Sequence, residues 1–262
     1  MFNFFKKKKE VVRVVAEETK LSTITDYEDV SKLADYFKNE TGVTFEKQTS
    51  ILKSKLTTFC KLRNIYSFTE LLQNIKSNES LKQELIDSLT TNETFFYREF
   101  QQIAELTKLV KQSSTMVRIL CAPSATGEEP YSIAIALLEA GVSSSQFSIL
   151  GIDINSDALK KANTAIYRER NVRNLSPQII AAYFHKEENS YTLKNSVKSL
   201  VSFKLVNIFD DSFKTIGKFD FVFSRNMLIY FDKETKIKAK KILESLRKNN
   251  TYDVFFGHAD LF

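Results

Sequence analysis

The sequence predicts an α/β protein in which a Rossmann-like, doubly wound, mostly parallel sheet follows a small all-α domain and contains a small inserted β-subdomain. Residues 27–89 show helical apolar periodicity and no strand pattern. From residue 116 onward, short apolar runs alternate with amphipathic helical patterns, which is typical of parallel strands joined by crossover helices. Polar side chains follow successive strand ends, as they do at the ligand-binding edge of such sheets.

The composition is that of a globular protein outside the membrane. The chain has 262 residues, 43% of them hydrophobic, which is enough for one large domain or two smaller ones. No apolar run approaches the roughly 20 residues of a membrane-spanning helix. The basic run at residues 6–9 follows a Phe cluster, whereas in a signal peptide it would precede an apolar segment. We therefore expect a cytoplasmic protein without membrane insertion.

The net charge of +6 raises the question of a nucleic-acid partner. The basic residues, however, are dispersed among 32 acidic ones, and the only dense basic run is the one at residues 6–9. Such a run is usually a solvated tail. We therefore expect no specific nucleic acid as a partner, and a modest positive field suits an acidic protein substrate.

The first part of the chain predicts an extension and a helical domain. Residues 1–26 offer too little apolar surface to pack, so we expect a flexible N-terminal extension. Residues 27–89 form the helical domain, and its expected helices are residues 30–37, 44–62, 68–75 and 80–89.

The longest of these helices is amphipathic. Its apolar face is expected to join the core and carries Leu52, Leu56, Phe59 and Leu62. Its opposite face carries Lys47, Lys53 and Lys61. These lysines form either an ordinary solvated face or a docking surface for an acidic helical partner. Cys60 and Cys121 lack metal or redox spacing, so we expect both in the core.

Residues 90–115 are expected to form a linker helix. Thr91 can cap it, and neighbouring aromatic residues can pack against the rest of the protein. Asn92, Thr94 and Arg98 would then place an amide, a hydroxyl and a guanidinium within about two helical turns. Such a set suits a lid over a bound cofactor and an anionic substrate.

The stretch from residue 116 to 141 reads as a strand, a tight loop of small residues and a helix that begins near Glu128. The loop lacks the G-x-G-x-x-G pattern, so a pyrophosphate is not favoured. Glu128 at the helix start would repel phosphate and suits a cationic ligand such as S-adenosylmethionine, which has a sulfonium and an ammonium group. The acidic pair of Glu128 and Glu129 is equally consistent with favourable charge in a first helical turn.

Three later strands are expected to end in polar residues at the same rim of the sheet. The strand at residues 147–152 ends in Asp153, a position where a carboxylate accepts ribose hydroxyl protons. The strands at residues 201–206 and 219–224 end near Asn207 and Asn226. Each Asn alone is more often a turn residue, but together with Asp153 they describe a binding crevice.

Helices at residues 157–165 and 233–246 and a last strand at 252–256 complete the expected sheet. Residues 167–199 are polar and read as an insertion. It contains a helix at residues 179–184 and a short antiparallel strand or loop at residues 190–194. Insertions on a rigid scaffold commonly contact the partner.

Four sequence blocks resemble one family. They are TNETFFYRE at residues 91–99, APSATGEEPYSIA at 122–134, GIDINSDALKKA at 151–162 and FDFVFSRNMLIYFD at 219–232. In this order they resemble the CheR-type chemotaxis receptor methyltransferases, from about Tyr27 to the end of the chain. The resemblance implies a class I S-adenosylmethionine-dependent protein-glutamate O-methyltransferase, with residues 116–262 as its catalytic domain. It also implies that the partner is the cytoplasmic helical domain of chemoreceptors and that the insertion, in some members, docks a receptor tail.

The resemblance also implies the site residues. The positions that match cofactor contacts in the family are Asn92, Thr94, Arg98, Glu128, Asp153, Asn207 and Asn226. Arg98 and Tyr230 match positions next to the reacting groups. Methyl transfer to a carboxylate needs alignment more than a base, so Arg98 would hold the substrate carboxylate and Tyr230 would orient it. Tyr230 is alternatively a core residue.

Other functions remain open at this stage. A non-catalytic module that binds S-adenosylmethionine or S-adenosylhomocysteine and docks receptors is the main alternative, and an RNA methyltransferase, suggested by charge alone, ranks below it. We expect a monomer, because no heptad seam is present. The family usually continues beyond GHADLF into a closing β-hairpin, so we expect either a sheet that ends in an exposed edge or a sequence that is cut short.

Overall fold

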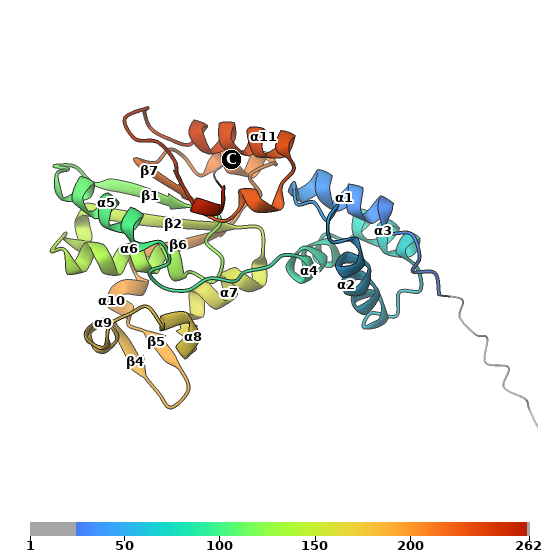
Figure 1. The fold of residues 1–262 in the computed structure, drawn as a ribbon, viewed down its shortest axis with the longest axis horizontal. Coiled ribbons are helices and arrows are strands. Elements are labelled where there is room, and N and C mark those ends of the chain that lie inside the picture. Colours follow the sequence, from blue (N-terminus) through green and yellow to red (C-terminus); the bar gives the residue numbers. More distant parts are fainter. Residues whose placement is uncertain (1–24, 261–262) are drawn as a thin grey trace, which may run out of the picture.

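The computed structural model describes residues 25–260, which form a helical lobe beside a lobe built on a sheet (Figure 1). Nearly all of the predicted N-terminal extension lies outside the described residues. Its last residue, Asp26, pairs with Ser67 as a short parallel bridge of the helical lobe.

The helical lobe consists of α1 (Ser31–Thr41), α2 (Thr49–Lys61), α3 (Phe68–Ser77) and α4 (Glu79–Leu89). Ser67 and Asn78 start α3 and α4, because each side chain accepts a hydrogen bond from a backbone N–H of the first turn. The apolar faces of the helices meet in a common core, to which α2 contributes Leu52, Leu56, Phe59 and Cys60. Leu62 was expected in this core, but it is 76% exposed because α2 ends at Lys61.

The central sheet is parallel throughout. Its strands, in spatial order, are β6 (Val201–Leu205), β2 (Phe147–Asp153), β1 (Val117–Cys121), β7 (Phe221–Ser224) and β8 (Phe255–Phe256). Neighbouring strands pair in parallel register across the whole sheet. The predicted doubly wound parallel sheet is thereby confirmed. The chain order reverses beside β1, and the carboxyl ends of β1 and β7 form the switch point at which such sheets bind ligands.

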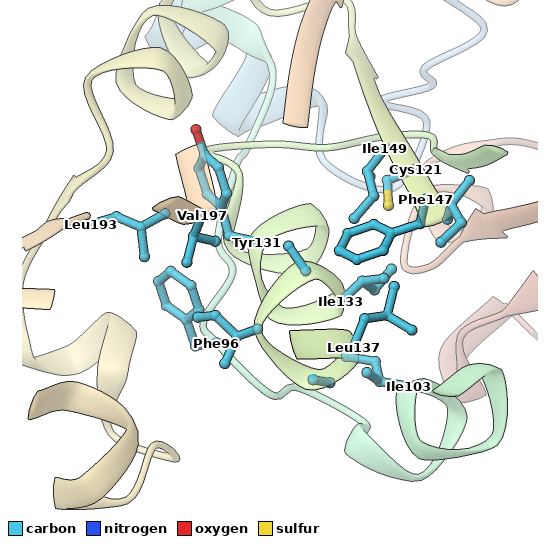
Figure 2. Packing of buried hydrophobic residues seen from close by; sticks show 14 of the residues in the cluster. Phe96, Ile103, Cys121, Tyr131, Ile133, Leu137, Phe147, Ile149, Leu193 and Val197 are labelled. Carbon is cyan, nitrogen blue, oxygen red and sulfur yellow. The ribbon is translucent and has the colours of Figure 1, made fainter. Parts of the chain in front are cut away.

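Helices cover both faces of this sheet because its strands are apolar on both sides. In β1, Ile119 and Cys121 face one core cluster, while Leu120 faces another. The first cluster includes α5 (Phe100–Lys111) and α6 (Glu128–Glu139), and the second includes α11 (Lys233–Ser245). In Figure 2, Ile133 and Leu137 of α6 lie near Phe147 of the sheet. Helix α7 (Ser156–Thr164) contacts β2 and β6.

The predicted insertion forms a three-stranded antiparallel sheet, in the order β3 (Ile166–Tyr167), β5 (Tyr191–Leu193) and β4 (Phe184–Lys186). Its short helices are α8 (Glu169–Val172), α9 (Pro177–Tyr183) and α10 (Asn195–Lys198). Phe96 anchors it, because its ring packs edge-on against Tyr167 and Phe184 with centroid distances of 4.8 and 5.3 Å. Single-turn 3₁₀ helices lie at Ser144–Gln146, Asp211–Thr215, Leu228–Tyr230 and His258–Asp260.

The expected linker helix at residues 90–115 is confirmed only for Phe100–Lys111 and is wrong at both ends. The helix begins at Phe100, and residues 90–99 form an extended segment followed by a turn. Tyr97 and Glu99 have positive φ angles of 57° and 48°, which a helix does not allow. Distant buried side chains hold this turn, since Arg225 donates to the carbonyl of Arg98 (2.8 Å) and Ser132 accepts from the N–H of Tyr97 (3.0 Å). Helical spacing therefore does not position Asn92, Thr94 and Arg98.

Across residues 25–260, no helix is long and apolar enough to cross a membrane.

Candidate functional site

A cavity of about 1020 Å³ lies at the carboxyl edge of the central sheet, and both lobes line it. The helical lobe contributes the connection between α1 and α2, and the sheet contributes the loops after β1, β2, β6 and β7. Pockets for one small ligand usually measure roughly 300–1,000 Å³, so this cavity has room for a cofactor and a substrate side chain. The predicted site residues that line it are Asn92, Thr94, Arg98, Asp153, Asn207, Asn226 and Tyr230.

Asp153 ties the loops after β1 and β2 together. Its Oδ2 accepts from the N–H of Ala125 (2.8 Å), and its Oδ1 accepts from the N–H of Asn155 (2.9 Å). Burial raises the pKa of Asp153 to about 6, although hydrogen bonds from backbone N–H groups oppose the shift. The carboxylate is thus largely ionised at neutral pH. Each of its oxygens has a further lone pair with which to accept a ligand hydroxyl.

Glu128 lies outside the cavity lining, although we expected it at the cofactor. The side chain is fully buried, where its Oε2 accepts from Thr126 (2.6 Å) and its Oε1 accepts from Asn171 (2.8 Å). The amide of Asn171 also donates to the carbonyl of Thr94 (3.4 Å). Burial raises the pKa of Glu128. Glu128 therefore fixes the insertion and the segment around Thr94, and its two oxygens are engaged in those contacts.

Glu129, the next residue, does line the cavity. Its Oε2 accepts from Nε of Arg225, whereas its Oε1 is buried and has no hydrogen-bond partner among residues 25–260. A buried polar atom without a partner costs roughly 1–3 kcal/mol, and more if it is charged. An acidic side chain in the cavity lining, with one oxygen left without a partner, fits the ammonium group of S-adenosylmethionine. Both residues lie in the first turn of α6, and only the rotation of the helix against the sheet decides which one faces the cavity.

Asn207 lines the cavity while both ends of its amide bind protein groups. The Nδ2 donates to the carbonyl of Glu40 at the end of α1 (2.6 Å), and the Oδ1 accepts from the N–H of Phe209 (2.9 Å). The side chain therefore connects the sheet to the helical lobe. A salt bridge between Lys38 and Asp232 (2.6 Å) also connects the two lobes.

Arg98 is a half-buried side chain of the cavity wall, and Tyr230, in the same wall, is 38% exposed. One N–H of Arg98 donates to the carbonyl of Glu93 (3.3 Å), and its guanidinium lies 5.7 Å from the centre of the Phe95 ring. Burial raises the pKa of Tyr230, and the positive charge of Arg98 partly offsets this rise. The phenol is therefore protonated at neutral pH and can donate a hydrogen bond. Both side chains line the same cavity and carry hydrogen-bond donors.

The switch point of this parallel doubly wound sheet carries two acidic side chains, Glu129 and Asp153, an arrangement that suits a ligand with a cationic group and hydroxyl groups. The family described as "CheR methyltransferase, SAM binding domain" matches residues 92–262, and "CheR methyltransferase, all-alpha domain" matches residues 28–90. The chain belongs to the CheR methyltransferase family, which confirms the resemblance and identifies S-adenosylmethionine as the cofactor.

Relatives named "Chemotaxis protein methyltransferase" are similar over most of the chain. One from Campylobacter jejuni is 38% identical over 221 residues, which cover 84% of this chain and 83% of the relative. One from Borreliella burgdorferi is 30% identical over 249 residues, covering 89% and 88% of the two chains. One from Escherichia coli K12 is 30% identical over 227 residues, covering 84% and 79%. The chain is therefore a methyltransferase of the chemotaxis class.

Proposed function

We propose that this enzyme transfers the methyl group of S-adenosylmethionine to glutamate side-chain carboxylates of chemoreceptors and so forms glutamate methyl esters. The observation that carries the proposal is the composition of the cavity. Its lining combines the acidic side chain of Glu129, one oxygen of which has no hydrogen-bond partner among the described residues, with two donors suited to a substrate carboxylate, Arg98 and Tyr230. The role requires a cytoplasmic location, where the helical domains of chemoreceptors lie.

Two acidic residues of the cavity would contact different parts of the cofactor. Glu129 would accept from the ammonium group, and Asp153 would accept from the ribose hydroxyls. We propose Glu129 in place of Glu128, because only Glu129 lines the cavity. The remaining polar residues that we propose as cofactor contacts are Asn92, Thr94, Arg98, Asn207 and Asn226.

Transfer consists of one displacement: a substrate carboxylate oxygen bonds to the methyl carbon as the carbon–sulfur bond breaks, and the sulfonium becomes the neutral thioether of S-adenosylhomocysteine. The nucleophile is already an anion, so the protein needs no general base. Arg98 holds the carboxylate through a charge-assisted hydrogen bond, and Tyr230 donates a second, weaker one that sets its direction. Hydrogen bonds from two strong donors would lower the nucleophilicity of the carboxylate. One cationic donor, Arg98, and one neutral donor, Tyr230, therefore suit the reaction.

Basic side chains of the cavity lining support an acidic partner. They include Lys47 and Lys55 from the helical lobe, Lys233 from α11 and Arg173 from the insertion. Opposite charges on the two partners steer encounter and fix orientation. The carboxylates on a receptor helix provide the complementary charge.

The test is transfer of a radioactive methyl group from labelled S-adenosylmethionine to purified receptor cytoplasmic fragments. We expect label that mild base releases, because a methyl ester hydrolyses whereas an N-methyl group does not. Arg98→Ala should lower kcat/KM by roughly 10- to 150-fold, which corresponds to a charged hydrogen bond of about 1.5–3 kcal/mol. Arg63→Ala is the matched control, because Arg63 pairs with Glu84 on the helical lobe and lies outside the cavity lining.

Two results would contradict the proposal. Base-stable label would show that another group is methylated. Tight binding of S-adenosylhomocysteine without transfer to any receptor fragment would favour the non-catalytic docking module instead.

A further inference from the structure

Asp260 is a buried carboxylate that lies outside the cavity lining yet binds the turn that carries two cavity residues. It belongs to the last 3₁₀ helix and is 1% exposed. Its Oδ2 accepts from the backbone N–H of Asn226 and from that of Gly257, the second at 3.3 Å. The backbone N–H groups of Leu228 and Ile229 also favour the charged form of this carboxylate, although burial raises its pKa.

The turn that Asp260 binds needs such support. It begins at Asn226, two residues after the end of β7, and the φ of 61° at Asn226 lies in the left-handed region that costs most residues free energy. The first N–H groups of the following 3₁₀ helix have no partner within that helix, as at any helix start. Asp260 accepts from the N–H of Asn226 at the start of this turn, and its other oxygen, Oδ1, is buried without a hydrogen-bond partner among residues 25–260.

Two cavity residues depend on the geometry of this turn. Asn226 lies at its start and Tyr230 lies at its end, and both line the cavity. The backbone of Tyr230 is held from the other side as well, because its carbonyl accepts from the N–H of Thr44 in the helical lobe (2.9 Å). A shift of the turn would therefore move a cofactor contact and a substrate contact together.

We infer that Asp260 is a positioning residue for methyl transfer: by holding the backbone of residues 226–230, it directs Asn226 toward the cofactor and Tyr230 toward the substrate carboxylate. The inference rests on the proposed function for the roles of these two side chains. Displacement of reacting groups by about 1 Å can lower a rate by roughly 100-fold, so a residue remote from the cavity can matter for the rate.

The experiment compares Asp260→Ala and Asp260→Asn with a control, Asp253→Ala, in the full chain. The Asp253 side chain is fully solvent-exposed in the same C-terminal segment and contacts only Arg247 among charged groups of the described residues (3.4 Å). Three quantities are measured: hydrogen–deuterium exchange of the peptide spanning residues 226–230 without ligand, the affinity for S-adenosylhomocysteine, and kcat and KM with receptor fragments.

We expect Asp260→Ala to raise exchange of this peptide by roughly 10- to 100-fold, because the N–H of Asn226 loses its acceptor and the turn that begins there loses its support. We also expect kcat to fall by about tenfold or more and binding of S-adenosylhomocysteine to weaken. Asp260→Asn keeps an acceptor oxygen of lower strength, so its values should lie between those of wild type and Asp260→Ala. Asp253→Ala should match wild type in all three measurements.

Unchanged exchange in Asp260→Ala would overturn the inference, since Asp260 would then not hold the turn. Raised exchange with unchanged kcat and affinity per folded molecule would also overturn it, because Asp260 would then affect stability alone. An active wild type with unaffected Asp260 variants refutes only this inference. A wild-type enzyme that transfers no methyl group to receptor fragments refutes the proposed function. In that case, raised exchange and weaker S-adenosylhomocysteine binding in Asp260→Ala would still support positioning by Asp260.

Discussion

Glu129→Gln tests the cofactor site most sharply, because Glu128 offers a matched control one residue away. The substitution removes the negative charge and keeps the size of the side chain. Oε1 of Glu129 is buried without a hydrogen-bond partner in the described part of the chain, while both oxygens of Glu128 have protein partners. Only Glu129 should therefore influence a ligand cation directly.

The expected magnitude follows from the kind of bond that is lost. A hydrogen bond to a charged group contributes about 1.5–3 kcal/mol, which corresponds to a roughly 10- to 150-fold increase in Kd for S-adenosylhomocysteine. Glu129→Gln also removes the acidic partner of Arg225, whose side chain is 3% exposed. Breaking a buried ion pair typically costs about 3–5 kcal/mol of stability, so Tm should fall as well.

A second ligand separates these two effects. Methylthioadenosine keeps the adenosine part of the cofactor and lacks the ammonium group. By isothermal titration, Glu129→Gln should weaken S-adenosylhomocysteine much more than methylthioadenosine, and Glu128→Gln should mainly lower Tm. An equal loss for both ligands in Glu129→Gln would refute the reasoning, as would a larger selective loss in Glu128→Gln.

Three further predictions concern the substrate, the pH dependence and the junction of the lobes. Tyr230→Phe removes one neutral hydrogen bond and should lower kcat by about 2- to 12-fold in the methyl-transfer assay, so an unchanged kcat would exclude a role in orientation. Burial raises the pKa of Asp153 to about 6, so its carboxyl gains a proton below that pH. The Kd for S-adenosylhomocysteine should therefore rise about tenfold as the pH falls from 7 to 5. Asp153→Asn should abolish this pH dependence. Gly42→Ala would strain a positive φ and place a Cβ 2.3 Å from the Phe209 ring, whereas in the control, Gly141→Ala, the φ strain is the same and no atom lies within 4 Å of the new Cβ. The Tm of Gly42→Ala should therefore be lower than that of Gly141→Ala. Equal Tm values would show that the junction of the lobes adapts to the added methyl group.

The sequence was sufficient for the sheet and most helices because their apolar patterns are local. The expected strands at residues 116–121 and 147–152 agree with β1 and β2 to within one residue at each end. Residues 90–99 could not be predicted in this way. Their local pattern is compatible with a helix, but Arg225 and Ser132 hold them in a turn, and these side chains are distant in sequence.

The site was predicted as a set of strand ends, and most of that set does line one cavity. Sequence could not distinguish Glu128 from Glu129, because that choice depends on how α6 packs on the sheet. It also could not show that the amide of Asn207 binds the helical lobe through Glu40, since this contact exists only after the lobes meet. Asp260 lacks any sequence signal of its own, because only the fold brings it beside Asn226.

Mapping the methylated product shows whether the enzyme methylates glutamate carboxylates of chemoreceptors. Receptor cytoplasmic fragments would be incubated with the enzyme and S-adenosylmethionine, digested and sequenced by tandem mass spectrometry. We expect single methyl additions on glutamate side chains, and we expect mild base to remove them. The Arg98→Ala variant should produce far fewer of these additions. Methyl groups on lysine or arginine, or no modified receptor residue in the presence of an enzyme that binds S-adenosylhomocysteine, would contradict the proposed function.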